Sequence, residues 1–397
     1  MSQHANCHLC DGYLSEVSGY PVGCQVTSDC RQWKGDGRLA VCGDCGLVQK
    51  IVTNNWLCEV KEIYSAYDVY KQSGGVEQVT FNQMTGESSA RSQKIVDWLL
   101  SSGVIPETGS LLDIGCGNGA FLKVFSASCQ GWKMMGFEYD GRNKQIVESI
   151  PRVTKLHVGS IDGINECFDL IVLIHALEHI PNPVDYLKSL AKKLKPGGLL
   201  CIEVPNLKTS PFDILIADHC SHFTEETLIK IVTSAGFEPL NCSESHVPKE
   251  LSLLARYPAE TETFSFVDNQ DQSFISDRSE IRETENILKS NIQWLEKLLL
   301  QGKSISGEIG VFGSSISATW LTGSLDGKVS FFIDEDSHRI GHKHMTLPIY
   351  SPNEISISNR ASILMPLRSD IAAAIQQRFQ SMSLQFILPP EESFVAG

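Results

Sequence analysis

The stretch LLDIGCGNGAFL at residues 111–122 places Gly115, Gly117 and Gly119 directly after a short apolar run. Glycines in this pattern let the chain leave a strand in a tight turn and bring its backbone close to a ligand, with a helix N-terminus just beyond. Glu138 closes the next predicted strand, about twenty residues on, where a carboxylate can bind both ribose hydroxyls of a nucleotide. The segment therefore predicts a strand–turn–helix unit that binds a nucleoside-containing ligand.

Strand and helix patterns alternate over residues 110–205, as they do in βαβ units. The continuous apolar run at 168–177 is typical of a central parallel strand that is covered on both faces. We expect strands at 110–115, 133–140, 168–177 and 199–206, and helices at 119–127, 142–150 and from 182 to a stop at Pro196 and Gly197. This order predicts an α/β fold with a doubly wound sheet.

At 397 residues the chain is too long for one ordinary core, so we expect several domains. We divide it into a zinc-binding module (1–62), a core with an N-terminal helical connector (63–245), a linker with a long helix (246–304) and a C-terminal α/β domain on the substrate side (305–397). Helical spacing groups Ile95, Val96, Leu99 and Leu100 in the connector, and Ile281, Leu288, Ile292, Leu295 and Leu299 in the long helix. The second stripe predicts a core face, with an oligomer interface as the alternative.

Two CxxC pairs, CHLC and CGDC, lie in the first domain, which has too few apolar residues for a core of its own. Two such pairs provide a tetrahedral S4 site for zinc, and because protein fills every position the ion is expected to be structural. Without a thioredoxin-like βαβ pattern, a redox role is disfavoured. The predicted zinc ligands are Cys7, Cys10, Cys42 and Cys45, with His8, Cys24 and Cys30 nearby as possible replacements.

The composition excludes several classes of function. A formal charge of −14 argues against a nucleic-acid surface, which needs a basic field. No apolar run is long enough to span a membrane. The N-terminus lacks the order of a signal peptide, and the 13 cysteines, an odd number, favour reduced thiols or a metal site over disulfides. We therefore expect a cytoplasmic protein without a nucleic-acid or membrane partner.

The glycine stretch resembles motif I of the class I S-adenosylmethionine (SAM)-dependent methyltransferases. Asp113, two residues before the first glycine, suits a cationic ligand with an amino group. The segments HVGSID, FDLIVLIHALEHIPNP and LKPGGLLCIEVPN resemble the later motifs of that family. The resemblance implies a Rossmann-like core that binds SAM through Asp113, Gly115, Gly117, Gly119, Glu138 at the ribose, Ser160 and Ile161 at the adenine, and His175 near the methyl group.

The order of zinc module, methyltransferase core and C-terminal α/β domain resembles the zinc-containing sugar C-methyltransferases of deoxysugar biosynthesis. This resemblance implies that the carbon of a nucleotide-linked keto sugar is methylated through an enolate. That family carries a Tyr-x-Glu-His cluster where this chain has Ile216, Asp218 and His219.

Carbon methylation needs a base that removes a proton beside a carbonyl group. We expect His219, oriented by Asp218, to be this base, with His222 and His175 as further candidates. Tyr64, Tyr67 and Tyr70 of the connector are candidate acids or orienting hydroxyls. Each histidine could instead be a packed imidazole without a catalytic role.

Other functions stay open at this point. The acceptor could be another small metabolite that is methylated on oxygen or nitrogen, and the chain could be a monomer or a homodimer. A non-catalytic scaffold with a zinc module is disfavoured by the intact glycine loop, Asp113 and Glu138. A nucleic-acid methyltransferase with a zinc ribbon is disfavoured because HALEH stands where an Asn/Asp-Pro-Pro-aromatic motif would lie.

Overall fold

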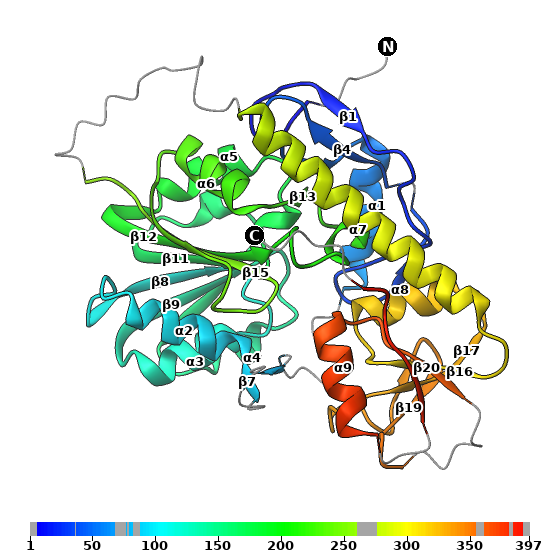
Figure 1. Cartoon of the computed structure of the whole chain (residues 1–397). Helices are drawn as coiled ribbons and strands as arrows, with labels where there is room; N and C mark the ends of the chain where they lie inside the picture. Colours follow the sequence, from blue (N-terminus) through cyan, green and yellow to red (C-terminus); the bar gives the residue numbers. More distant parts are fainter. Residues whose placement is uncertain are drawn as a thin grey trace.

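The computed structural model of the protein describes residues 6–35, 37–67, 77, 79–81, 88–259, 276–354, 361–380 and 384–391. Three parts are visible in Figure 1: a central sheet flanked by helices, an N-terminal module, and a smaller C-terminal sheet domain. The long helix α7 (Arg278–Ser304) runs beside the N-terminal module and reaches the C-terminal domain (Figure 1).

The central sheet has seven strands in the order β10-β9-β8-β11-β12-β15-β14. The first five are parallel, whereas β15 is antiparallel to both of its neighbours. The strands are β8 (Thr108–Ile114), β9 (Gly131–Glu138), β10 (Val153–Val158), β11 (Phe168–Ile174), β12 (Leu194–Pro205), β14 (Glu238–Ser243) and β15 (Glu250–Arg256).

Helices cover both faces of this sheet. The apolar residues of α2 and α3 pack on one face, and those of α5 and α6 pack on the other. These helices, with the short α4, are α2 (Arg91–Ser101), α3 (Ala120–Ser128), α4 (Lys144–Glu148), α5 (Pro183–Ala191) and α6 (Glu225–Ser234). The predicted α/β fold with a Rossmann-like core is confirmed.

Three details of the core differ from the sequence expectations. Helix α5 ends at Ala191, because the chain must be extended by Leu194 to pair with Phe168; Pro196 and Gly197 therefore lie in β12. In α2, Leu100 is exposed and Trp98 is buried instead, since positions three and four after Ile95 share its face. Strand β15 belongs to the central sheet although it follows the boundary expected at 245.

The N-terminal module contributes a small sheet that extends into the core. Its order is β1-β4-β5-β13, and every neighbour is antiparallel. The strands are β1 (Leu14–Glu16), β4 (Leu39–Cys42), β5 (Val48–Lys50) and β13 (Ser221–His222), beside the hairpin β2 (Gln25–Val26) and β3 (Gln32–Trp33). Helix α1 (Asn54–Ser65) follows, capped by the side chain of Thr53. Because β13 belongs to the central part of the chain, this sheet joins the module to the core.

The C-terminal domain has a six-stranded sheet in the order β18-β19-β17-β16-β20-β21, parallel except for β18. Its elements are β16 (Ile309–Phe312), α8 (Ile316–Ser324), β17 (Val329–Ile333), β18 (Lys343–His344), β19 (Leu347–Tyr350), β20 (Ser362–Leu364), α9 (Ser369–Arg378) and β21 (Gln385–Ile387). The predicted stripe of α7 is buried, and Leu288, Ile292, Leu295 and Leu299 of it lie in an apolar cluster with residues of this domain and of the N-terminal module. Its prediction as a core face is confirmed.

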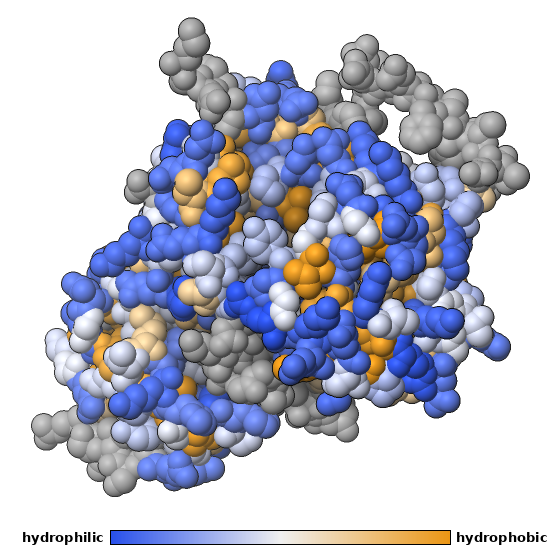
Figure 2. Space-filling model, turned by 180° about the vertical axis from the view of Figure 1, so that it is seen from behind, coloured by the Kyte–Doolittle hydropathy of each residue, from blue (hydrophilic) through white to orange (hydrophobic). Residues whose placement is uncertain are grey.

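The surface seen in Figure 2 carries mostly hydrophilic residues, with hydrophobic ones in small patches between them. Within the described ranges, no helix combines the length and the apolarity that are needed to cross a bilayer.

Candidate active site

A cavity of about 390 Å³ opens at the carboxyl ends of the central strands, where ligands bind in open α/β sheets. The glycine loop and the end of β11 line one part of it. The N-terminal module adds Ser28, Asp29 and Cys30, and the C-terminal domain adds Ser315, Ser317 and Arg339. All three parts of the chain therefore meet at this cavity.

The glycine loop connects β8 to α3, and its three glycines all have positive φ. Gly119, at φ +81°, is the N-cap residue of α3. A Cβ atom at this position would lie 2.4 Å from Cδ1 of Ile150. Both the backbone conformation and the space therefore require glycine, and the turn leaves the N-terminus of α3 beside the cavity.

Two carboxylates flank the loop. Asp113 is 2% exposed, and its Oδ2 has no hydrogen-bond partner among the described residues. Oε1 of Glu138 accepts from the backbone N–H of Gly117 at 2.6 Å, and Oε2 accepts from that of Tyr139 at 3.1 Å. Burial raises the pKa of both acids, that of Asp113 well above its usual value. An orphaned acid beside a glycine turn fits a cationic nucleoside such as SAM.

Ser160 and Ile161 lie outside the lining of the cavity. Ser160 caps the short helix η2 (Ile161–Gly163), with its hydroxyl accepting from the backbone N–H of Asp162, and Ile161 is buried. Their contact with an adenine stays a prediction.

His175 follows β11 and lines the cavity. Its Nδ1 lies 3.1 Å from Oε1 of Glu178, and its Nε2 lies 3.4 Å from Oε1 of Glu250. Burial disfavours the charged imidazole, but the negative charge of Glu250 and the bond to Glu178 outweigh it and raise the pKa to about 10. The role of His175 as a base stays a prediction, and so does its place beside the cofactor.

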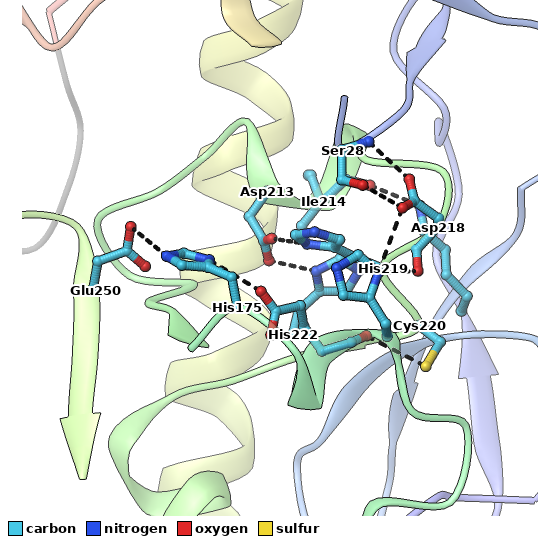
Figure 3. Close-up of polar contacts among 12 residues, drawn as sticks. Ser28, His175, Asp213, Ile214, Asp218, His219, Cys220, His222 and Glu250 are labelled. Atoms are coloured by element: carbon cyan, nitrogen blue, oxygen red, sulfur yellow. Dashed lines mark hydrogen bonds and ion pairs between the residues drawn. The ribbon is translucent and has the colours of Figure 1, made fainter. Parts of the chain in front are cut away.

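His219 also lines the cavity, and its partner differs from the expected one. Its Nδ1 lies 2.6 Å from Oδ1 of Asp213, whereas Asp218 accepts from the backbone N–H and hydroxyl of Ser28 at 2.9 and 2.5 Å (Figure 3). The prediction that Asp218 orients His219 is therefore wrong, and Asp213 has this role. Burial lowers the pKa of His219, but the hydrogen bond and charge of Asp213 prevail and raise it.

His222 shares the same carboxylate. Its Nδ1 lies 2.5 Å from Oδ2 of Asp213 (Figure 3). The ring is 1% exposed, lies outside the cavity lining, and has an Nε2 without a partner among the described residues. The prediction of His222 as a second base does not fit a ring that an acceptor cannot reach.

The N-terminal module holds the segment 213–222 in place. Strand β5 pairs with β13, and the backbone N–H of Ala217 donates to the carbonyl of Val26 at 2.7 Å. The indole of Trp56 donates to the carbonyl of Ala217 at 2.9 Å, and the ammonium of Lys50 donates to that of Ile214 at 2.7 Å. The position of His219 therefore depends on the module as well as on the core.

The four predicted zinc ligands come together. The Sγ atoms of Cys7 and Cys45 lie 3.4 Å apart, those of Cys10 and Cys42 lie 3.5 Å apart, and all four lie within 4.8 Å of one another. Bonds of about 2.3 Å to a tetrahedral zinc require sulfur atoms at such spacings, so the four residues fit the ion. The alternatives lie elsewhere: His8 contacts Ser221, Cys24 contacts Trp320 and Ser324, and Cys30 lines the cavity.

Sequence reasoning missed Asp213, Arg91 and Glu250, which the cavity brings together with the predicted histidines. Asp213 could have been found from the sequence, because it lies in one short segment with His219 and His222. Of the connector tyrosines, Tyr64 stacks edge-on against His179 with 6.1 Å between ring centres, and Tyr67 lines the cavity. Tyr70 lies outside the described residues.

The chain is similar to known methyltransferases. Residues 88–241 match the family model described as "Methyltransferase domain". The ubiquinone biosynthesis O-methyltransferase of Cereibacter sphaeroides is 24% identical over 152 residues, which are 33% of this chain and 61% of that protein. The dTDP-4-amino-2,3,4,6-tetradeoxy-D-glucose N,N-dimethyltransferase of Saccharopolyspora spinosa is 32% identical over 122 residues, which are 27% of this chain and 48% of that protein.

Among solved structures, a SAM-dependent methyltransferase from Methanosarcina mazei aligns with 41% of this chain and 98% of its own, at 19% identity and a TM-score of 0.33. This chain spans 61% and 48% of the length of the two curated relatives described above. The sheet order, the glycine loop and the family model together identify residues 88–241 as a class I SAM-dependent methyltransferase domain.

Proposed function

We propose that the chain is an enzyme that transfers the methyl group of SAM to a small-molecule acceptor. One observation carries the proposal: a single cavity joins the glycine loop and the orphaned oxygen of Asp113 to the buried pair His219–Asp213. The first end suits a cationic nucleoside, and the second suits an acceptor that must lose a proton.

SAM supplies a methyl group that its sulfonium already activates, so in-line placement of the acceptor provides much of the rate. The residues of the chain have to hold the two molecules and control the acceptor proton. We assign the cofactor end to Asp113, the glycine loop and Glu138. We assign the proton control to His219, whose ring Asp213 fixes through Nδ1.

For the acceptor we propose a nucleotide-linked keto sugar, methylated on a carbon through an enolate. The C-terminal domain, which supplies Ser315, Ser317 and Arg339 to the cavity, would then face the substrate. The name of the Saccharopolyspora relative, which refers to a dTDP-linked amino sugar, supports a sugar acceptor. Methylation of an oxygen or a nitrogen is the second candidate, which the names of both relatives favour.

The test uses the full chain, SAM with a labelled methyl group, and a panel of nucleotide-linked keto sugars, amino sugars and phenolic acceptors. We expect S-adenosylhomocysteine and a labelled product with one acceptor class. Exchange of an acceptor proton with heavy water, measured without methyl transfer, separates carbon methylation from the second candidate. An absence of SAM binding in calorimetry would disprove the proposed function.

A further inference from the structure

Three side chains of types that bind metals meet beside the acceptor end of the cavity, apart from the cysteine cluster; two of them line the cavity, and the third, a glutamate, is buried behind them. They are Glu178 and His179, in the short helix η3 (Leu177–His179), and His219. One ligand atom of each lies within 4.8 Å of the other two. The backbone fixes this arrangement, because the N–H of Cys220 donates to the carbonyl of Glu178 at 2.8 Å.

The two imidazoles are oriented through the same ring nitrogen. Nδ1 of His219 contacts Asp213, and Nδ1 of His179 lies 3.0 Å from the backbone carbonyl of Asp218. Neither Nε2 has a hydrogen-bond partner in the part of the chain that the structure describes. Histidines that bind metals are held in this way: the far nitrogen donates to a carboxylate or a carbonyl, and the near nitrogen is left for the ion.

Glu178 supplies an oxygen that lacks a partner. The residue is 0% exposed; its Oε1 contacts His175, and its Oε2 has no hydrogen-bond partner among the described residues. A buried carboxylate oxygen without a donor is costly, and a bound cation would satisfy it. Negative charge behind the two rings would also compensate the charge of a bound cation, because Asp213 contacts Nδ1 of His219 and Asp218 contacts Nδ1 of His179.

We propose that Glu178, His179 and His219 bind a first-row divalent cation that holds the acceptor beside the methyl group. Two imidazoles and one carboxylate leave open coordination positions, which oxygen atoms of an acceptor and water can fill. This inference rests on the proposed function and specifies how His219 controls the proton: its Nε2 holds the ion, and a metal-bound hydroxide acts as the base.

The step balances as follows. The metal-bound hydroxide accepts the acceptor proton and becomes metal-bound water, while the electron pair stays on the acceptor as an enolate or alkoxide. The cation stabilises that oxyanion. The acceptor then forms its bond to the methyl carbon as the carbon–sulfur bond breaks, and the sulfonium becomes a neutral thioether. The acceptor class is thus a molecule with a keto or hydroxyl oxygen that can coordinate the ion.

The test uses Mn²⁺ as the probe, since this ion is paramagnetic and does not compete well for a thiolate site. The full chain, with zinc retained at the cysteines and other metals removed by a mild chelator, is titrated while electron paramagnetic resonance measures free Mn²⁺. We expect one saturable Mn²⁺ per chain. Glu178→Gln and His219→Gln should weaken binding at least about tenfold, and Asp213→Asn by about 10- to 100-fold.

The matched control is His338→Gln, which removes a 56% exposed imidazole of the C-terminal domain outside the cavity and should leave the titration unchanged. If a variant does not fold, the stoichiometry of the wild-type chain still decides. No saturable Mn²⁺, or binding that both Glu178→Gln and His219→Gln retain in full, overturns the site. Full methyl transfer by chelated enzyme overturns the role of the ion and leaves the proposed function intact. A chain that binds Mn²⁺ but neither binds SAM nor methylates any acceptor disproves the proposed function instead.

Discussion

Asp213 accepts a hydrogen bond from Nδ1 of His219 at 2.6 Å, although the two residues lie on opposite sides of the turn that follows the helix η4 (Asp213–Leu215). Both side chains are almost fully buried. A carboxylate in this position fixes which ring nitrogen faces the cavity. We therefore propose that the chemistry of the acceptor end depends on Asp213. Asp218, which directly precedes His219 in the sequence, contacts Ser28 instead.

The first prediction concerns Asp213→Asn. The amide keeps the size of the side chain but removes the charge that favours one tautomer of His219, so turnover should fall by about 10²- to 10⁴-fold. SAM affinity should stay unchanged, because the glycine loop is untouched. Single-turnover rates and calorimetry measure the two quantities, with the exposed Asp97→Asn as the control. A variant that turns over at the wild-type rate would make the Asp213–His219 contact purely structural.

The second prediction concerns Glu138→Ala, which removes the proposed ribose ligand. Loss of charge-assisted hydrogen bonds should cost roughly 1–3 kcal/mol of SAM binding free energy. Calorimetry measures the dissociation constant, and Glu166→Ala, an exposed acid with 51% of its side chain accessible, is the control. If both variants bind SAM as the wild type does, Glu138 only supports the loop through its bond to Gly117.

The third prediction links the zinc site to catalysis. Cys42→Ser should lose zinc, lower the unfolding temperature and slow methyl transfer, because β4 and β5 of the module position the segment 213–222 through β13. Metal analysis, thermal unfolding and turnover are measured on the same preparation. Cys58→Ser, which replaces an exposed cysteine of α1, should change none of them. Zinc well under one equivalent in the wild-type chain would contradict the assignment.

Local patterns predicted the parts of the site that depend on local structure. The glycine loop needs only a strand, positive φ values and a helix start within a few residues, and sequence patterns indicate all three. The cysteine pairs converge because each CxxC knuckle presents two thiolates. The face of α7 follows from helical spacing alone.

The contacts of the histidines could not be predicted from local sequence patterns. Asp213 reaches His219 and His222 because backbone groups of the module hold this segment, and partners such as Val26 and Lys50 are more than 160 residues away in sequence. Likewise, β15 lies between β12 and β14 in the central sheet. This position depends on strand pairing across the fold, and the polar stretch that follows β15 in the sequence does not indicate it. Tertiary contacts therefore place the side chains at the acceptor end, whereas local structure is enough to form the glycine loop at the cofactor end.

The last prediction concerns Glu203 in β12, which is 0% exposed. Burial, together with the nearby charge of Glu250, raises the pKa of Glu203 to about 8 from 4.5, against the smaller opposing influence of His175 and Arg91. Since the folded chain binds this proton more tightly than the unfolded chain does, the contribution of Glu203 to stability falls as the pH rises from about 4.5 to about 8. Below this window the acid is neutral in both states.

Glu203→Gln cannot ionise, so it should match the wild type near pH 4 and exceed it in unfolding free energy at pH 9. One pKa unit corresponds to about 1.4 kcal/mol, so the gain should be of the order of a few kcal/mol. Denaturant unfolding at several pH values measures it, and Glu238→Gln, at an exposed position of β14, should run parallel to the wild type. If the Glu203→Gln curve also runs parallel to the wild type from pH 4 to 9, the carboxyl group is ionised in the folded chain. The positive charge of Arg91 or His175 must then stabilise the ionised carboxylate of Glu203 by more than its burial in β12 destabilises it.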